Sequence, residues 1–83
     1  MDVNPSARKH GFANEDVVFA ASTAFWTARL DEGDPSRELR LGFSRSGIPL
    51  EIIVLIFDDG DVEAIHAMRM RTMYVRMLNK GRL

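Results

Sequence analysis

The sequence predicts an α+β domain in which a helix precedes a four-stranded antiparallel meander and a short helix follows it. Three observations support this fold class. An early stretch has apolar residues at helical spacing, the middle of the chain holds four strand-like runs separated by turn residues, and the last stretch returns to helical spacing. Because 83 residues are enough for one domain only, we assign residues 1–83 to a single domain and expect residues 1–8 to be flexible.

The first helix is predicted over about residues 15–23. Asn14 can cap its start with a side chain, and the acidic Glu15 and Asp16 suit the positive end of the helix dipole. Apolar side chains then recur at helical spacing, at Val17, Val18, Ala21, Ala24 and Phe25. Cap, charge and spacing therefore agree on a helix.

The first two predicted strands differ in pattern. The stretch FWTARL is aromatic and partly alternating, and a loop rich in Gly, Pro and acidic residues follows it, so a strand ends near Leu30. In RELRLGF the charged residues Glu38 and Arg40 alternate with apolar ones, which is the period of a half-exposed strand.

A hairpin is predicted to join the last two strands. LEIIVLIF is apolar on both faces and rich in branched residues, which favours the central strand of the sheet. The Asp59-Gly60 dipeptide favours a tight turn into VEAIHAM. Strict alternation in that last strand places Ala64, His66 and Met68 on one face.

The two ends of the chain carry opposite charge. Residues 1–36 hold three basic and six acidic residues, whereas residues 69–83 hold five basic residues and no acidic ones, although the net charge is only −1. Two of these basic residues, Arg76 and Lys80, fall on a C-terminal helix predicted from Thr72 onward. A local basic patch suits a phosphate site or an acidic partner better than extended wrapping of nucleic acid.

The amino-acid composition excludes several kinds of site. The chain has no cysteine, which excludes disulfides and thiolate metal sites, and two histidines alone make a poor metal site, so we expect neither a metal nor another cofactor. The start lacks the apolar stretch of a signal peptide, and the longest apolar run, IIVLIF, is too short to span a bilayer. We therefore expect a cytoplasmic protein without membrane contact.

His66 is the main candidate for chemistry. Small alanines flank it, and Arg69 and Arg71 follow at the strand exit. An imidazole exchanges protons near neutral pH, and guanidinium groups bind phosphate bidentately. Together they suit metal-free RNA cleavage, in which a base deprotonates the ribose 2′-hydroxyl, a cation stabilises the phosphate and an acid protonates the leaving oxygen. The alternative is a half-buried histidine that is hydrogen-bonded in the sheet.

Further candidates lie on other segments. Lys9 and His10, ahead of the first helix, supply an ammonium group and a second imidazole, or they form only a solvated turn. Arg40 could pair with Glu51 or Glu63 across the strands, or it could face phosphate. The spacing does not decide between these alternatives.

The whole layout resembles a known family, from KHGF ahead of a helix through RELRLGFSRSGIPLEIIVLIF and a D-G hairpin to IHAMRMR before a short helix. Over about residues 8–80 it is similar to the BrnT-like toxins of the RelE/ParE superfamily, which belong to bacterial type II toxin–antitoxin systems. The resemblance implies a compact α+β toxin that degrades RNA without a metal and is neutralised by a co-encoded antitoxin. The residues that match the family pattern are Lys9, His10, Gly11, Arg40, and Arg69 or Arg71.

We therefore predict a bacterial toxin that acts as a metal-independent ribonuclease and inhibits translation and growth. The catalytic candidates are His66, His10, Arg40 and Arg71, and the candidates for binding RNA phosphate are Lys9, Arg69, Arg76 and Lys80. The expected partners are a cognate antitoxin and an RNA substrate, in a homodimer or a toxin–antitoxin hetero-oligomer. The alternative is a non-catalytic binding module of the same fold that inhibits a protein target such as gyrase or only forms a complex with its partner.

Overall fold

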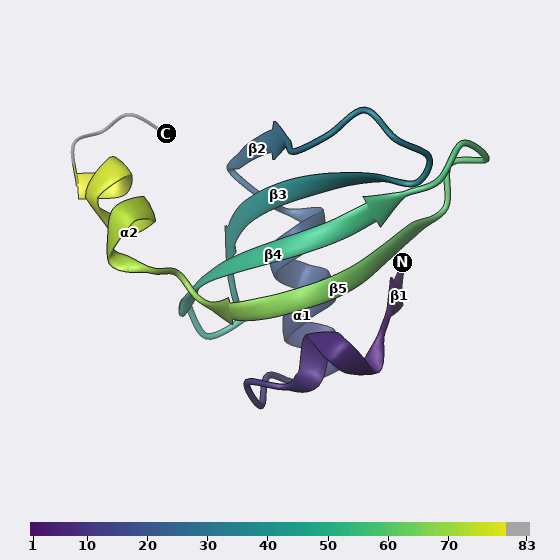
Figure 1. Cartoon of the computed structure of the whole chain (residues 1–83). Helices are drawn as coiled ribbons and strands as arrows, with labels where there is room; N and C mark the ends of the chain where they lie inside the picture. Colours follow the sequence, from purple (N-terminus) through teal and green to yellow (C-terminus); the bar gives the residue numbers. More distant parts are fainter. Residues whose placement is uncertain (80–83) are drawn as a thin grey trace.

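The structure is a computed structural model that describes residues 1–79, and it confirms the α+β class (Figure 1). The five strands form one sheet in the order β1-β5-β4-β3-β2. Helix α1 crosses one face of the sheet, and α2 lies beyond the end of β5 (Figure 1). The elements are β1 (Asp2–Val3), the 3-10 helix η1 (Pro5–Arg8), α1 (Asn14–Ser22), β2 (Trp26–Arg29), β3 (Ser36–Phe43), β4 (Pro49–Ile56), β5 (Val62–Arg69) and α2 (Thr72–Asn79).

Strands β2 to β5 form the predicted antiparallel meander, but the sheet has five strands and not four. The additional strand, β1, pairs in parallel with β5. Helix η1 then packs on β5 with Ala7 fully buried, so the start of the chain, predicted to be flexible, belongs to the folded unit. A two-residue strand and a single helical turn are too short to leave a periodic signal in a sequence.

Helix α1 begins one residue earlier than predicted, and Asn14 does not cap it. The cap position belongs to Ala13, whose side chain makes no capping hydrogen bond. The Asn14 Oδ1 atom instead accepts a hydrogen bond from Nε of Arg8 at 3.1 Å. A contact with η1 has therefore replaced the local cap that the sequence suggested.

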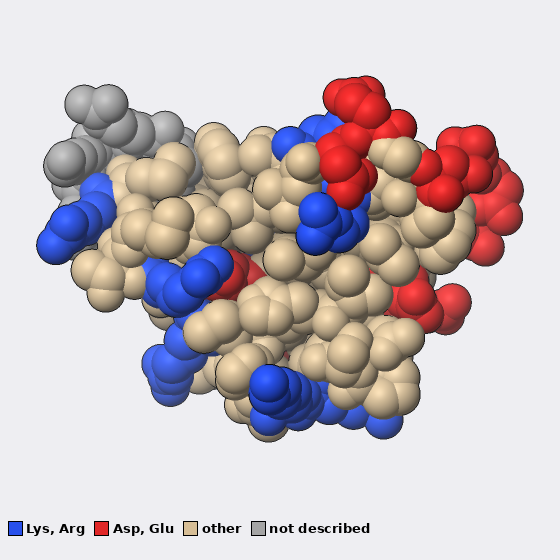
Figure 2. Space-filling model, in the orientation of Figure 1, with Lys and Arg blue, Asp and Glu red and all other residues tan. Residues whose placement is uncertain are grey.

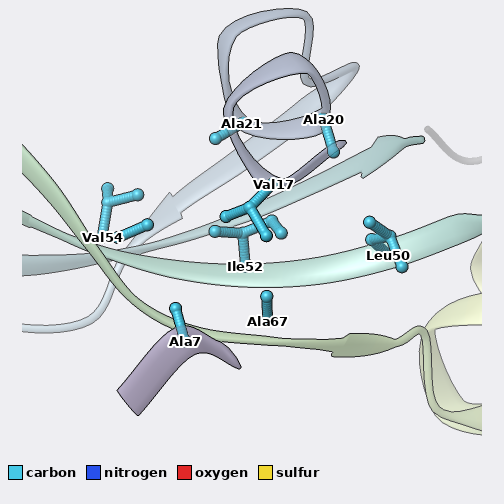
Figure 3. Packing of buried hydrophobic residues seen from close by; sticks show 9 residues of the cluster. Ala7, Val17, Ala20, Ala21, Leu50, Ile52, Val54 and Ala67 are labelled. Atoms are coloured by element: carbon cyan, nitrogen blue, oxygen red, sulfur yellow. The ribbon is translucent and has the colours of Figure 1, made fainter. Parts of the chain in front are cut away.

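The main core lies between α1, η1 and the sheet (Figure 3). Small residues on α1 allow a close approach: a Cβ added to Gly42 of β3 would lie 2.2 Å from the carbonyl oxygen of Ala20. Only glycine fits that contact. The buried residues of this core are Ala7, Val17, Ala20, Ala21, Leu50, Ile52, Val54, Ala64 and Ala67.

A second, smaller core covers part of the opposite face of the sheet. Leu39, Leu41 and Met70 are buried there against side chains from α2 and from the start of β2. The other face of β3, which carries Arg40 and Gly42, lies toward α1. Strand β3 is therefore covered on both faces. Of the helices in residues 1–79, none is long and apolar enough to cross a membrane.

A bulge in β5 changes which residues share a face. The pairing with β4 shifts so that Ile65 is an extra residue, and Ala64 and Ala67 both face the main core. His66 and Met68 lie on the opposite face. The prediction that Ala64 and His66 share a face is wrong for this reason. The turn at Asp59-Gly60 that precedes β5 is as predicted, with φ of +92° at Gly60.

Candidate functional site

A buried carboxylate lies at the centre of the site. Glu51 belongs to β4, points away from α1, and its side chain is 0 % exposed. Its Oε1 atom accepts two hydrogen bonds from Arg71, one from the backbone N–H and one from Nε, both at 3.0 Å. Its Oε2 atom is buried without a hydrogen bond and lies 3.6 Å from Nε2 of His66. Because a buried carboxylate needs cationic or donor partners, Glu51 organises the groups around it.

The Arg71 side chain is hydrogen-bonded to Glu51 and is also partly exposed to solvent. Arg71 lies two residues beyond the end of β5, and its guanidinium carbon lies 5.7 Å from the centroid of the Tyr74 ring. The hydrogen bond and the charge of Glu51 raise the pKa of Arg71 above its ordinary value, with a smaller contribution from Tyr74. Because the side chain remains 56 % exposed, this fixed cation can still bind an anion from solvent.

The two histidines of the chain meet at the outer edge of β5. The His66 side chain is 31 % exposed, and its ring centroid lies 6.0 Å from that of His10 in an edge-on arrangement. The segment before His10 is tied to β5 by a 2.7 Å hydrogen bond from Oγ of Ser6 to the carbonyl of Ile65. Glu51, His66 and His10 therefore form a row from the interior to the surface.

This row has the parts of a proton-transfer site. Nε2 of His66 lies near the Glu51 carboxylate but beyond hydrogen-bond distance of it, and an imidazole can either accept or donate a proton. His10 is exposed and can carry a second proton. Arg71 provides a fixed positive charge beside the same carboxylate. Two imidazoles and a guanidinium group are the kinds of side chain that act as base, acid and cation in phosphodiester chemistry.

Basic side chains gather around this end of the molecule. In Figure 2 many of them lie over the parts of this face near α2 and η1, and others lie among the acidic side chains near the β2–β3 loop; acidic side chains also lie at the β4–β5 turn. Three candidates for binding phosphate, Lys9, Arg69 and Arg76, are exposed. The fourth, Lys80, lies outside the described residues.

A pocket of about 230 Å³ adjoins the histidine pair. It is lined by His10 and Phe12, from the segment between η1 and α1, and by Met68 and Arg69, at the end of β5. Among residues 1–79, no carboxylate lines it, and Arg69 is its one permanently charged group.

Arg40, in contrast, lies away from the other catalytic candidates. Its side chain is 18 % exposed, and Nε donates to Glu38 at 2.8 Å. Its Nη1 donates to the carbonyl oxygen of Ala21 near the end of α1 at 3.2 Å. Arg40 therefore points toward α1, on the face opposite His66, and pairs with neither Glu51 nor Glu63. Its contacts fix the end of a helix, as a basic side chain near a C-terminus commonly does.

Glu51 is the residue that the sequence reading missed as part of the site. A single charge within a run that is apolar on both faces was the available signal, since a carboxylate there must be buried and paired. Its partner could not be identified, because Arg71 is one of several arginines in the next segments. Within residues 1–79, no three His, Asp or Glu side chains are grouped so that they could hold a metal ion.

Comparison with protein-family models, with curated proteins and with solved structures finds no match to this chain.

Proposed function

We propose that this chain is a cytoplasmic bacterial toxin of the BrnT-like type that cleaves RNA without a metal and is neutralised by a cognate antitoxin. One observation carries the proposal: His66 lies between a buried carboxylate and a second, exposed histidine, beside an arginine that the same carboxylate holds. Two imidazoles and a fixed guanidinium group are a sufficient set for phosphodiester cleavage by internal attack.

In the proposed reaction, one histidine takes the proton of a ribose 2′-hydroxyl as its oxygen attacks the adjacent phosphorus. A bond from the 2′-oxygen to phosphorus forms, and the bond from phosphorus to the 5′-oxygen breaks. The other histidine gives a proton to that leaving oxygen, which produces a 2′,3′-cyclic phosphate and a 5′-hydroxyl. Arg71 stabilises the charge that develops on the phosphate oxygens. His66, whose ring faces Glu51, is the better oriented base.

The test is cleavage of end-labelled RNA by the purified chain in the presence of a metal chelator. We expect products that end in a 2′,3′-cyclic phosphate, and a rate at least about a hundredfold lower for His66→Ala and for His10→Ala. Arg29→Met is the matched control, because it removes an exposed charge at the opposite edge of the sheet. A folded chain that leaves RNA intact, and whose expression without the antitoxin does not slow growth, contradicts the proposal.

A second candidate function is that of a non-catalytic binding module, and one observation favours it. An apolar hollow of about 500 Å³ lies on α1, lined in part by Val18 and Phe19, and Phe19 is 42 % exposed. Apolar surface of this kind suits contact with another protein. Growth inhibition that survives both histidine substitutions supports this function over RNA cleavage.

A further inference from the structure

The pocket at the end of β5 offers a place for part of a ligand beside the histidine pair. His10 belongs to both features, because its ring contacts His66 edge-on and also lines the pocket. The pocket volume of about 230 Å³ is below the range of roughly 300–1,000 Å³ that holds drug-sized ligands. A single ring system is the size of group that suits it.

The residues that line the pocket suit a flat aromatic ligand that carries hydrogen-bond acceptors. The rings of His10 and Phe12 can stack on a flat aromatic group, and the sulfur of Met68 can contact the edge of such a group. Arg69 provides five hydrogen-bond donors and no acceptor. Within residues 1–79, no carboxylate lies within ion-pair distance of Arg69, so these donors are not already used by a charged partner.

A flat ligand that faces arginine must present acceptors. Guanine has two of them, O6 and N7, side by side on one edge, whereas adenine places the N6 donor beside N7. Arginine binds the guanine edge with two parallel hydrogen bonds. Cytosine also has two adjacent acceptors, O2 and N3, but its single six-membered ring is smaller than a purine and fills less of the pocket.

From these observations we propose that His10, Phe12, Met68 and Arg69 form a guanine-binding subsite, which places a guanosine of the RNA next to the phosphate that His66 and Arg71 act on. This inference rests on the proposed function, and it assigns Arg69 to base recognition instead of phosphate binding. The chain would then cut RNA beside guanosine.

The first test compares short oligouridines that carry one guanosine, adenosine or cytidine. We expect cleavage beside guanosine to be at least about tenfold faster than beside the other bases, and Arg69→Met to remove most of that preference. The control Arg29→Met should keep it. If Arg69→Met slows cleavage equally at every base, Arg69 contacts phosphate and the subsite is wrong.

The second test does not require cleavage. Binding of guanosine and adenosine 3′-monophosphates is followed by NMR through the Met68 methyl group, and we expect guanosine monophosphate to bind at least about tenfold more tightly. Tighter binding of guanosine monophosphate by a chain that does not cleave RNA would overturn the proposed function and leave the subsite intact. Cleavage without base preference, together with equal binding of the two nucleotides, would overturn the subsite and leave the function.

Discussion

Replacing the buried Glu51 tests how the site is held together. In Glu51→Gln the amide oxygen can still accept hydrogen bonds from Arg71, and the buried negative charge is removed. The bond to the backbone N–H loses its charge assistance, worth about 1 kcal/mol, whereas the bond to the exposed guanidinium contributes little. Removal of a desolvated charge offsets part of this loss. We expect the free energy of unfolding to change by no more than about 1 kcal/mol.

Glu51→Ala should be much more harmful, because it removes the acceptor itself. The Arg71 backbone N–H loses its partner, at a cost of about 1–3 kcal/mol, and a fully buried side chain leaves a cavity. Together these effects predict a loss of about 3 kcal/mol. A domain of this length has a total stability of roughly 4–12 kcal/mol, so the loss is a large share of it.

Urea unfolding of the three proteins measures the difference. The matched control is Glu63→Ala on β5, since Glu63 has no ion pair within residues 1–79, and its effect should stay within about 0.5 kcal/mol. If Glu51→Gln and Glu51→Ala lose the same stability, the charge of Glu51 matters and its role as an acceptor does not. The reasoning about the site would then be wrong.

Two further predictions concern other parts of the fold. Gly42→Ala should lower the thermal midpoint by about 10 °C or more, because its Cβ would meet the Ala20 carbonyl oxygen and force α1 off the sheet; an unchanged midpoint in a calorimetric scan would show that the helix can move freely. Asp58→Asn should raise the midpoint at pH 7. The side-chain hydrogen bond to Asp34, and next the charge of Asp34, raise the pKa of Asp58 above its ordinary value of 3.8. The contact between the two carboxyl groups therefore stabilises the fold at low pH, and this stabilisation is lost as pH rises through the raised pKa. The gain from Asp58→Asn should therefore disappear near pH 3, and an equal gain at both pH values would contradict this assignment.

The sequence predicted the elements whose pattern is long and local. Both α-helices and the half-exposed strands repeat a period over several residues, LEIIVLIF is a continuous apolar run, and the Asp59-Gly60 dipeptide marks a turn, so these elements could be located. Strand β1 and η1 could not, because their stability comes from pairing with β5 and from burial of Ala7. The bulge at Ile65 was also missed, since nothing in VEAIHAM marks where the alternation fails.

Only part of the candidate site was predicted, because local sequence patterns do not reveal tertiary contacts. His66 and Arg71 were identified because they are close in sequence, and the structure places both around one carboxylate. The approach of His10 to His66 depends on η1 packing along β5, which is a tertiary contact. Arg40 was also predicted to be catalytic, but it lies elsewhere. Alternation along β3 shows which residues share a face with Arg40, and it does not show which face of the sheet that is. Which face meets α1 is decided by Gly42, where the helix comes closest.

The two faces of the sheet differ in how much apolar side chain they bury and in whether they hold a buried charge. The face toward α1 holds most of the buried apolar residues, so stability is concentrated there. The opposite face is only partly covered by α2, and it contains a carboxylate whose second oxygen lacks a hydrogen bond. An apolar residue at position 51 would avoid the cost of burying that charge, but it would leave Arg71 without its hydrogen-bond acceptor and His66 without a nearby carboxylate. A buried charge that is unfavourable for folding, that holds Arg71 by hydrogen bonds and that lies 3.6 Å from a half-buried histidine is typical of a functional site, and this is why we place the proposed chemistry at Glu51 and not at the apolar hollow on α1.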